Sequence, residues 1–229
     1  MTRTAATLGT LAAFATGCTT FATVRSAEVR PGFQGVVQAA GTPGPVGDVA
    51  GWFWGLDCTG PCNHPVGGAD VNAAYGWRPR TGRPFTIGGG VNGLIYPYVE
   101  GYVELAKIGR VPLGAGGRFG LPGIDQHWSE HALYARADVP LSPTVRLLYN
   151  PGLVWHMGSS PNNQTKGSFR GIVHGAGLEF DQGRLSIIPS AGWVFGRAEH
   201  GSGSLHVGPE SHGFGWIALG VDMHRPRRR

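Results

Sequence analysis

The chain has 229 residues, of which 40 are glycine, 17 are proline and only 14% are charged. This abundance of helix-interrupting residues excludes a mostly helical fold, and no run of about eighteen apolar residues could cross a membrane as a helix. The net charge of +5 would suit a nucleic-acid-binding protein, but three of the basic residues end the chain and the others are scattered. We therefore expect no nucleic-acid partner.

Residues 1–17 have the shape of an export signal. One basic residue, Arg3, is followed by an uncharged stretch rich in Ala, Leu and Thr that ends at Cys18. Residues 15–18 resemble the lipobox of bacterial lipoproteins, with Ala15 where that motif usually has Leu. The resemblance implies cleavage before Cys18 and a lipid on its thiol, whereas an ordinary cleaved signal with an incidental Cys is the alternative.

A lipid on Cys18 implies a tether over residues 18–29 between the membrane and the first strand. Thr19 follows the Cys, whereas an Asp at that place marks lipoproteins that stay at the inner membrane. The resemblance therefore implies sorting to the outer membrane.

From residue 30 onward, short segments of alternating apolar and polar character are separated by Gly, Pro, Asn and Asp, which is typical of strands in a meander. Ten segments of about nine to thirteen residues are long enough to cross a bilayer as tilted strands. The segments are residues 30–39, 69–78, 85–93, 96–105, 111–120, 131–139, 145–156, 168–180, 184–196 and 214–224. The sequence predicts an all-β, antiparallel meander that closes into a transmembrane barrel of about ten strands, within a range of eight to twelve.

The alternation also predicts what each face of a strand contacts. Val71, Tyr75 and Trp77 alternate with Asp70 and Asn72 in one segment, and later segments repeat the pattern. The apolar face is expected to meet lipid, and the polar face to fill a narrow interior with paired charges, which disfavours a general porin. The charges expected in the interior are Glu100, Glu104, Arg118, Arg136, Asp138, Arg146, Arg170 and Asp222.

Two local irregularities stand out among the expected strands. In residues 168–180, Glu179 falls out of phase with Arg170 and His174, which predicts a β-bulge near Gly175 or Gly177. The three glycines at 88–90 lie within a strand and are expected to permit curvature.

The connections between the expected strands alternate in length. Residues 40–68, 121–130, 157–167 and 197–213 form the long connections, and short turns join the other strands. Only the third-to-fourth connection, near Leu94, breaks this alternation. Long external loops and short periplasmic turns are typical of outer-membrane barrels. Residues 30–224 therefore resemble the small bacterial outer-membrane β-barrels, without matching a particular subfamily, and a basic tail follows at 225–229.

This resemblance implies a location in the outer membrane of a Gram-negative-type envelope, with both termini in the periplasm. The implied partners are the lipid of that membrane, the barrel assembly machinery and the lipoprotein sorting machinery. A surface ligand is left unidentified, and no cofactor is expected.

The first long connection contains two features of its own. Cys58 and Cys62 are the only cysteines apart from Cys18, and in an exported chain they are expected to form a disulfide across a tight loop. Residues 52–54 form a cluster of three aromatic side chains that could bind a ligand or pack against the barrel.

Most of the histidines fall in the long connections or beside them. His64, His127 and His131 are the candidates for a metal site, although no pair has the spacing of a known metal motif, so that polar loop composition is the expected explanation. His156, Ser159 and Glu130 bear a weak resemblance to the catalytic groups of outer-membrane lipid A deacylases. A turn is the expected structure around residue 159.

Three functions remain as hypotheses. The first is a barrel lipoprotein without enzymatic activity that binds a surface partner or reinforces the envelope. The second is a surface hydrolase of the lipid A deacylase or outer-membrane protease type. The third is a periplasmic, lipocalin-like ligand carrier, since the same alternation would serve a soluble barrel.

Overall fold

The computed structural model describes residues 24–42, 67–92, 96–121, 129–159, 165–202 and 205–224. These residues contain ten strands and no helix. The strands are β1 (Gly32–Gly41), β2 (Gly67–Trp77), β3 (Phe85–Asn92), β4 (Tyr96–Ile108), β5 (Val111–Gly120), β6 (Ser129–Pro140), β7 (Val145–Ser159), β8 (Thr165–Asp181), β9 (Leu185–Ser202) and β10 (Leu205–Met223). No helix among the described residues is long and apolar enough to cross a membrane.

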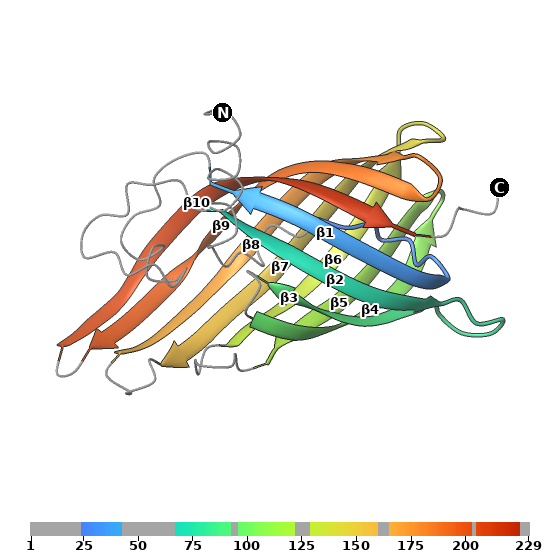
Figure 1. Ribbon diagram of the computed structural model, residues 1–229. Helices are drawn as coiled ribbons and strands as arrows, with labels where there is room; N and C mark the ends of the chain where they lie inside the picture. Colours follow the sequence, from blue (N-terminus) through green and yellow to red (C-terminus); the bar gives the residue numbers. More distant parts are fainter. Residues whose placement is uncertain are drawn as a thin grey trace, which may run out of the picture.

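The strands form a closed antiparallel meander, which confirms the predicted fold class (Figure 1). Each strand pairs with its neighbours in sequence, and β1 pairs with β10 to close the barrel. The strands are staggered around the barrel. If one starts at Met223 of β10 and steps from each residue to its register partner on the next strand, one full circuit ends at Ser211 of β10, twelve residues from the start. Such a stagger requires the strands to tilt by about 40° from the barrel axis.

The outer face of the barrel is apolar, as the alternation predicts. The inner face carries the buried charges, and β7 to β10 also turn an apolar cluster inward that includes Leu148, Ile188 and Trp216. In β2, Val71, Tyr75 and Trp77 are exposed by 43%, 44% and 46%, whereas Asp70 and Asn72 are each only 3% exposed. Exposed apolar side chains on the later strands include Val99, Leu133, Leu153, Ile172, Trp193, Phe195, Ile217 and Leu219. The barrel therefore has its apolar surface outside, which is the reverse of a soluble barrel.

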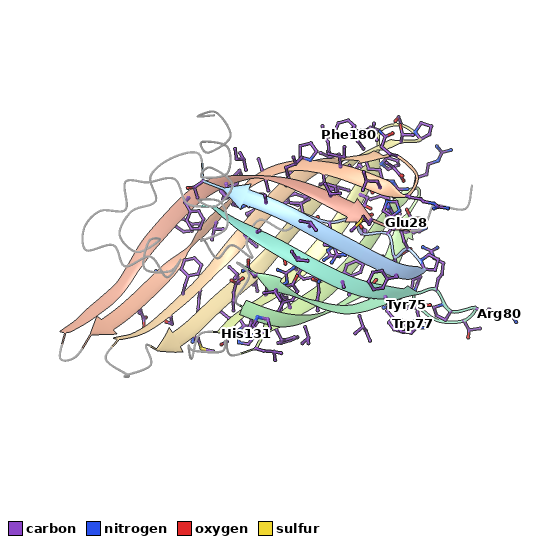
Figure 2. The ribbon with its side chains drawn as sticks, viewed as in Figure 1. Glu28, Tyr75, Trp77, Arg80, His131 and Phe180 are labelled. Carbon is purple, nitrogen blue, oxygen red and sulfur yellow. The ribbon has the colours of Figure 1, made fainter. Side chains whose placement is uncertain are left out.

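The four short turns lie at one end of the barrel, which we call the short-turn end (Figure 1). They are residues 78–84, 109–110, 141–144 and 182–184. Gly32 at the start of β1 pairs with Gly76 at this end, and the amide of His224 after β10 donates to the carbonyl of Arg184 at 3.0 Å. Tyr75, Trp77 and Phe180 lie near this end, and His131 lies nearer the other (Figure 2).

Two of the expected long connections are shorter than predicted. β7 continues to Ser159 and β8 begins at Thr165, while β9 continues to Ser202 and β10 begins at Leu205. Most of residues 197–213 is therefore paired strand. The predicted strand ends were placed where the alternation of apolar residues stops, which is the edge of the apolar outer surface. The backbone hydrogen bonds between the two strands of a hairpin continue beyond that edge.

The bulge expected near Gly175 or Gly177 is absent. The register of β8 is continuous with both β7 and β9. Glu179 is fully buried while Arg170 is exposed. The two residues are nine positions apart, so that strict alternation along an uninterrupted strand places them on opposite faces. The prediction was wrong because it assumed that every polar side chain of this strand points inward; register shifts occur instead in β4 and β10.

The glycines at 88–90 lie in β3 at points of close approach. A Cβ on Gly90 would lie 2.6 Å from the Tyr98 hydroxyl, and one on Gly88 would lie 2.5 Å from the Cβ of Ala74. These glycines therefore leave room for side chains of the two neighbouring strands. Their expected role in strand curvature stays a prediction.

Candidate functional site in the barrel interior

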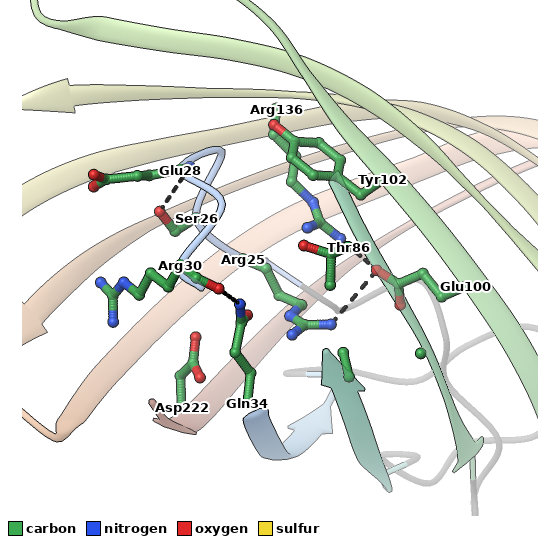
Figure 3. Close-up of a pocket in the computed structure, with 12 residues that line it drawn as sticks. Arg25, Ser26, Glu28, Arg30, Gln34, Thr86, Glu100, Tyr102, Arg136 and Asp222 are labelled. Atoms are coloured by element: carbon green, nitrogen blue, oxygen red, sulfur yellow. Dashed lines mark hydrogen bonds and ion pairs between the residues drawn. The ribbon is translucent and has the colours of Figure 1, made fainter. Parts of the chain in front are cut away.

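Residues 24–31, which we call the inner segment, lie inside the barrel. The positive φ of 94° at Gly32 reverses the chain where β1 begins. The residues before it then run back into the interior, where Val24, Ala27 and Val29 are 2%, 0% and 1% exposed. Figure 3 shows this segment among the strands of the wall. Its residues 24–29 belong to the stretch 18–29 that was expected to be a tether outside the barrel.

Glu100 of β4 is the centre of the first group of charges. Its carboxylate accepts hydrogen bonds from Arg136 at 2.7 Å, Arg118 at 3.2 Å and Arg25 of the inner segment at 3.5 Å (Figure 3). The Tyr134 hydroxyl donates to the same carboxylate at 2.6 Å. All three guanidinium groups are at least nine-tenths buried, so that their charges need compensation by carboxylates, and for Arg25 and Arg136 the paired carboxylate is that of Glu100.

Asp70 extends this group towards β2. Arg118 bridges Asp70 and Glu100, with 3.2 Å to each carboxylate. The Tyr98 hydroxyl donates to Asp70 at 2.7 Å, and the Arg118 guanidinium lies 3.9 Å from the centre of the Tyr98 ring. β2, β4 and β5 are thereby joined across the interior.

Asp138 of β6 holds the middle of the inner segment. Its carboxylate accepts hydrogen bonds from the Ser26 hydroxyl at 2.5 Å and from the backbone amides of Ala27 and Glu28 at 2.7 Å and 3.3 Å. Arg146 of β7 contacts the same carboxylate at 3.6 Å and that of Glu28 at 2.7 Å. A fully buried carboxylate thus satisfies backbone donors that would otherwise lack partners.

Two further contacts fix the course of the inner segment. The amide of Val29 donates to Glu104 at 3.2 Å, and the Tyr102 hydroxyl donates to the carbonyl of Ala27 at 2.8 Å. Val24, at the inner end, belongs to an apolar cluster with Leu148 and Trp216. The segment is therefore anchored along its whole described length.

Arg30 lies in a separate group of charges at the short-turn end. It forms ion pairs with Glu179 and, at 3.7 Å, with Asp181. The Ser186 hydroxyl donates to Glu179 at 2.8 Å and contacts His224 at 2.9 Å. Glu179, Asp181 and His224 could place their ligand atoms within 4.8 Å of one another around a metal ion. Because the Arg30 guanidinium already supplies positive charge to both carboxylates, this group does not favour a cation.

A small cavity remains between the inner segment and the wall (Figure 3). It is lined by Arg25, Ser26, Glu28, Arg30, Gln34, Ala74, Thr86, Gly88, Glu100, Tyr102, Arg136 and Asp222. Its lining is polar and charged, which suits water. Ligand pockets are larger and mostly apolar, so that this cavity is not a candidate for a drug-sized ligand.

The structure places the eight charges expected in the interior as follows. Glu100, Glu104, Arg118, Arg136, Asp138, Arg146 and Asp222 point into the interior, and their side chains are buried or nearly so. Arg170 is on the outer face, because it alternates with the buried Phe169. Sequence reasoning missed Arg25, which lies in the expected tether, and Arg30, which begins the expected strand at 30–39.

The candidate metal and catalytic residues are only partly described. His131 is on the outer face, where its ring lies between Phe119 at 6.0 Å and Trp155 at 5.8 Å. Glu130 and His156 are partners in the register of β6 and β7. Cys18, Cys58, Cys62, His64, His127 and residues 52–54 lie outside the described residues, as do the side chains of His156 and Ser159. Lipidation, the disulfide, a metal site and catalysis stay predictions.

No protein-family profile and no curated protein matches the chain. Among solved structures, the fold is similar to the crystal structure of the outer membrane protein Omp33 from Acinetobacter baumannii. The two chains are 9% identical, the match covers 86% of this chain and 99% of that one, and the TM-score is 0.29. The superposition is loose, and the fold of this chain, a closed antiparallel barrel with an apolar outer face, is established by its own strand pairing and exposed side chains.

Proposed function

We propose that the protein is an outer-membrane barrel with a structural or surface-binding role, and that its inner segment and buried charges keep the lumen closed. The observation that carries this proposal is the anchoring of residues 24–31 by Glu100, Asp138 and Glu104 from the wall. A segment that fills a narrow lumen leaves no continuous path for solutes.

The outer face supports the membrane location. Trp193 and Phe195 are each 59% exposed, and Ile217 is 56% exposed. A continuous apolar surface of this kind is unfavourable in water and favourable in lipid. The same exposure disfavours the lipocalin-like carrier, which would turn these side chains towards an internal ligand.

Aromatic residues near both edges of the apolar surface give further support. Tyr75, Trp77 and Phe85 form a contacting group near the short-turn end, with ring centroids 4.3 Å and 5.4 Å apart. Towards the other end, His131 stacks on Trp155 at 5.8 Å. Outer-membrane barrels carry aromatic girdles at both interfaces and place their short turns in the periplasm. The proposed orientation therefore has the short-turn end in the periplasm.

The lumen proposal is tested by conductance. The purified full-length protein is added to a planar lipid bilayer, after a shift in gel migration on heating has shown that the barrel is folded. We expect no stable conductance steps above the noise of the bare bilayer. Regular steps from the folded protein would contradict a closed lumen.

The location is tested by fractionation of cells that express the full-length protein or its Cys18→Ala variant. We expect both proteins in the outer membrane, with the same heat-dependent migration. A soluble variant without that migration shift would contradict an integral barrel. Labelling with a radioactive fatty acid, present in the parent and lost in Cys18→Ala, tests lipidation separately.

A further inference from the structure

Two arginines lie side by side on the outer face of the barrel. Arg170 of β8 and Arg197 of β9 are direct partners in the strand register, and both are exposed. Neither forms an ion pair with an acidic group among the described residues, and Glu199, two residues from Arg197 on the same face, makes no such contact with it. Like charges directly opposite one another in a sheet repel, so that an anion in contact with both guanidinium groups would stabilise this pair.

The height of the pair on the barrel indicates the kind of anion. Phe180 and Ile187 are partners near the short-turn end, and the arginine pair lies ten residues away along each strand. With about 3.3 Å per residue and a tilt of about 40°, these ten residues span about 25 Å along the barrel axis. This is about the height of the apolar band of an outer-membrane barrel.

The surface below the pair is apolar. Two residues nearer the short-turn end on each strand, Ile172 and Phe195 are register partners on the same outer face and are 48% and 59% exposed. Trp155 of β7 is the register partner of Arg170 on its other side. The two guanidinium groups therefore lie at the edge of the apolar surface, at the level where a bilayer places its phosphate groups.

We propose that Arg170 and Arg197 together bind the phosphate of a lipid headgroup, with the acyl chains of that lipid over Ile172 and Phe195. The guanidinium group forms paired, charge-assisted hydrogen bonds with phosphate oxygens. Two guanidinium groups from adjacent strands can share one phosphate, which removes their mutual repulsion. This inference rests on the proposed membrane location and adds a specific lipid contact in the leaflet away from the short-turn end.

The test measures lipid binding to the folded, full-length protein in a neutral detergent by native mass spectrometry. The probes are phosphatidic acid and diacylglycerol, which share acyl chains and differ in the phosphate. The variant is Arg170→Gln with Arg197→Gln. The matched control is Arg80→Gln with Arg184→Gln, which removes the same charge from exposed arginines of the short-turn end. Each variant must show the heat-dependent gel migration of the parent.

We expect the parent and the control to bind phosphatidic acid about tenfold more tightly than the Arg170/Arg197 variant, which corresponds to about 1.4 kcal/mol. Inorganic phosphate is expected to compete only weakly, because it lacks the acyl chains. Equal loss in both double variants would show general charge attraction, and equal binding of diacylglycerol would show acyl contacts alone; either overturns the inference. A folded barrel that inserts in membranes without this selectivity would overturn it and leave the proposed location intact.

Discussion

The Ser26 hydroxyl donates a hydrogen bond of 2.5 Å to the carboxylate of Asp138, from which it is separated by 112 residues of sequence. This bond joins the inner segment to β6 at a point where the backbone amides of Ala27 and Glu28 also donate to Asp138. One carboxylate thereby determines the position of the middle of the segment.

Replacing Asp138 by Ala is expected to loosen the inner segment. The change leaves the amides of Ala27 and Glu28 without their acceptor, and such a loss costs about 1–3 kcal/mol. Hydrogen exchange followed by mass spectrometry should show exchange of residues 24–31 faster by about tenfold or more. Val139→Ala, at an exposed neighbouring position, is the control and should leave the exchange unchanged. Equal protection in both variants would contradict the assigned role of Asp138.

Replacing Glu100 by Gln is expected to destabilise the barrel strongly. The variant keeps the volume of the side chain but leaves buried Arg25 and Arg136 without their carboxylate partner and Arg118 with Asp70 alone, at a cost of about 3–5 kcal/mol. The midpoint of urea unfolding, followed by tryptophan fluorescence, should fall accordingly.

Lys107→Gln is the comparison for Glu100→Gln. It breaks the 3.6 Å contact with Glu104 at a side chain that is 45% exposed, and should cost less than about 1 kcal/mol. Similar midpoints for the two variants would show that the buried charges do not depend on Glu100.

Gly192→Ala is expected to disturb the packing of the interior. A Cβ there would lie 1.9 Å from the carbonyl oxygen of His174 and 2.6 Å from the Trp216 ring. Overpacking of this kind costs about 1–3 kcal/mol. Gly101→Ala places its Cβ where no atom lies within 4 Å and should leave the unfolding midpoint unchanged. The prediction fails if the two midpoints shift by the same amount.

Leu219→Arg tests whether the outer face meets lipid. Leu219 is 55% exposed in β10, and an arginine within the apolar band of a membrane barrel costs about 2–4 kcal/mol. Ser211→Arg, exposed on the same strand beyond the band, should cost no more than about 1 kcal/mol. Folding into phosphatidylcholine vesicles, measured as a function of urea, compares the two. If Leu219→Arg is neutral, this face does not meet lipid.

Removing residues 24–30 is expected to open a cation-selective pore. Among its described residues, the wall presents six buried carboxylates, on Asp70, Glu100, Glu104, Asp138, Glu179 and Asp222. Facing them from the wall are the guanidinium groups of Arg118, Arg136 and Arg146. At the short-turn end, Arg78 and Lys107 contact Glu104 at 3.3 Å and 3.6 Å, while Arg25 and Arg30 come from the inner segment. Reversal potentials in a KCl gradient should show preference for K⁺ in a variant with the parent's heat-dependent migration. Anion preference, or a folded variant without conductance, would contradict this view of the lumen.

The sequence by itself determined the strands and their faces. Alternation of apolar and polar residues is a local pattern with a period of two, so that Val71, Tyr75 and Trp77 could be assigned to the outside without knowledge of any partner strand. The presence of ten strands and the positions of the short turns followed in the same way. So did the inward direction of Glu100, Asp138 and Asp222.

Only the tertiary structure decided where the inner segment lies and which charges pair. The contacts of Arg25 with Glu100 and of Arg30 with Glu179 join residues 75 and 149 positions apart. Such contacts exist because the barrel closes with one particular stagger, and that stagger depends on the register of all ten strand pairs together. No local pattern encodes it, which is why the sequence placed residues 24–29 in a tether.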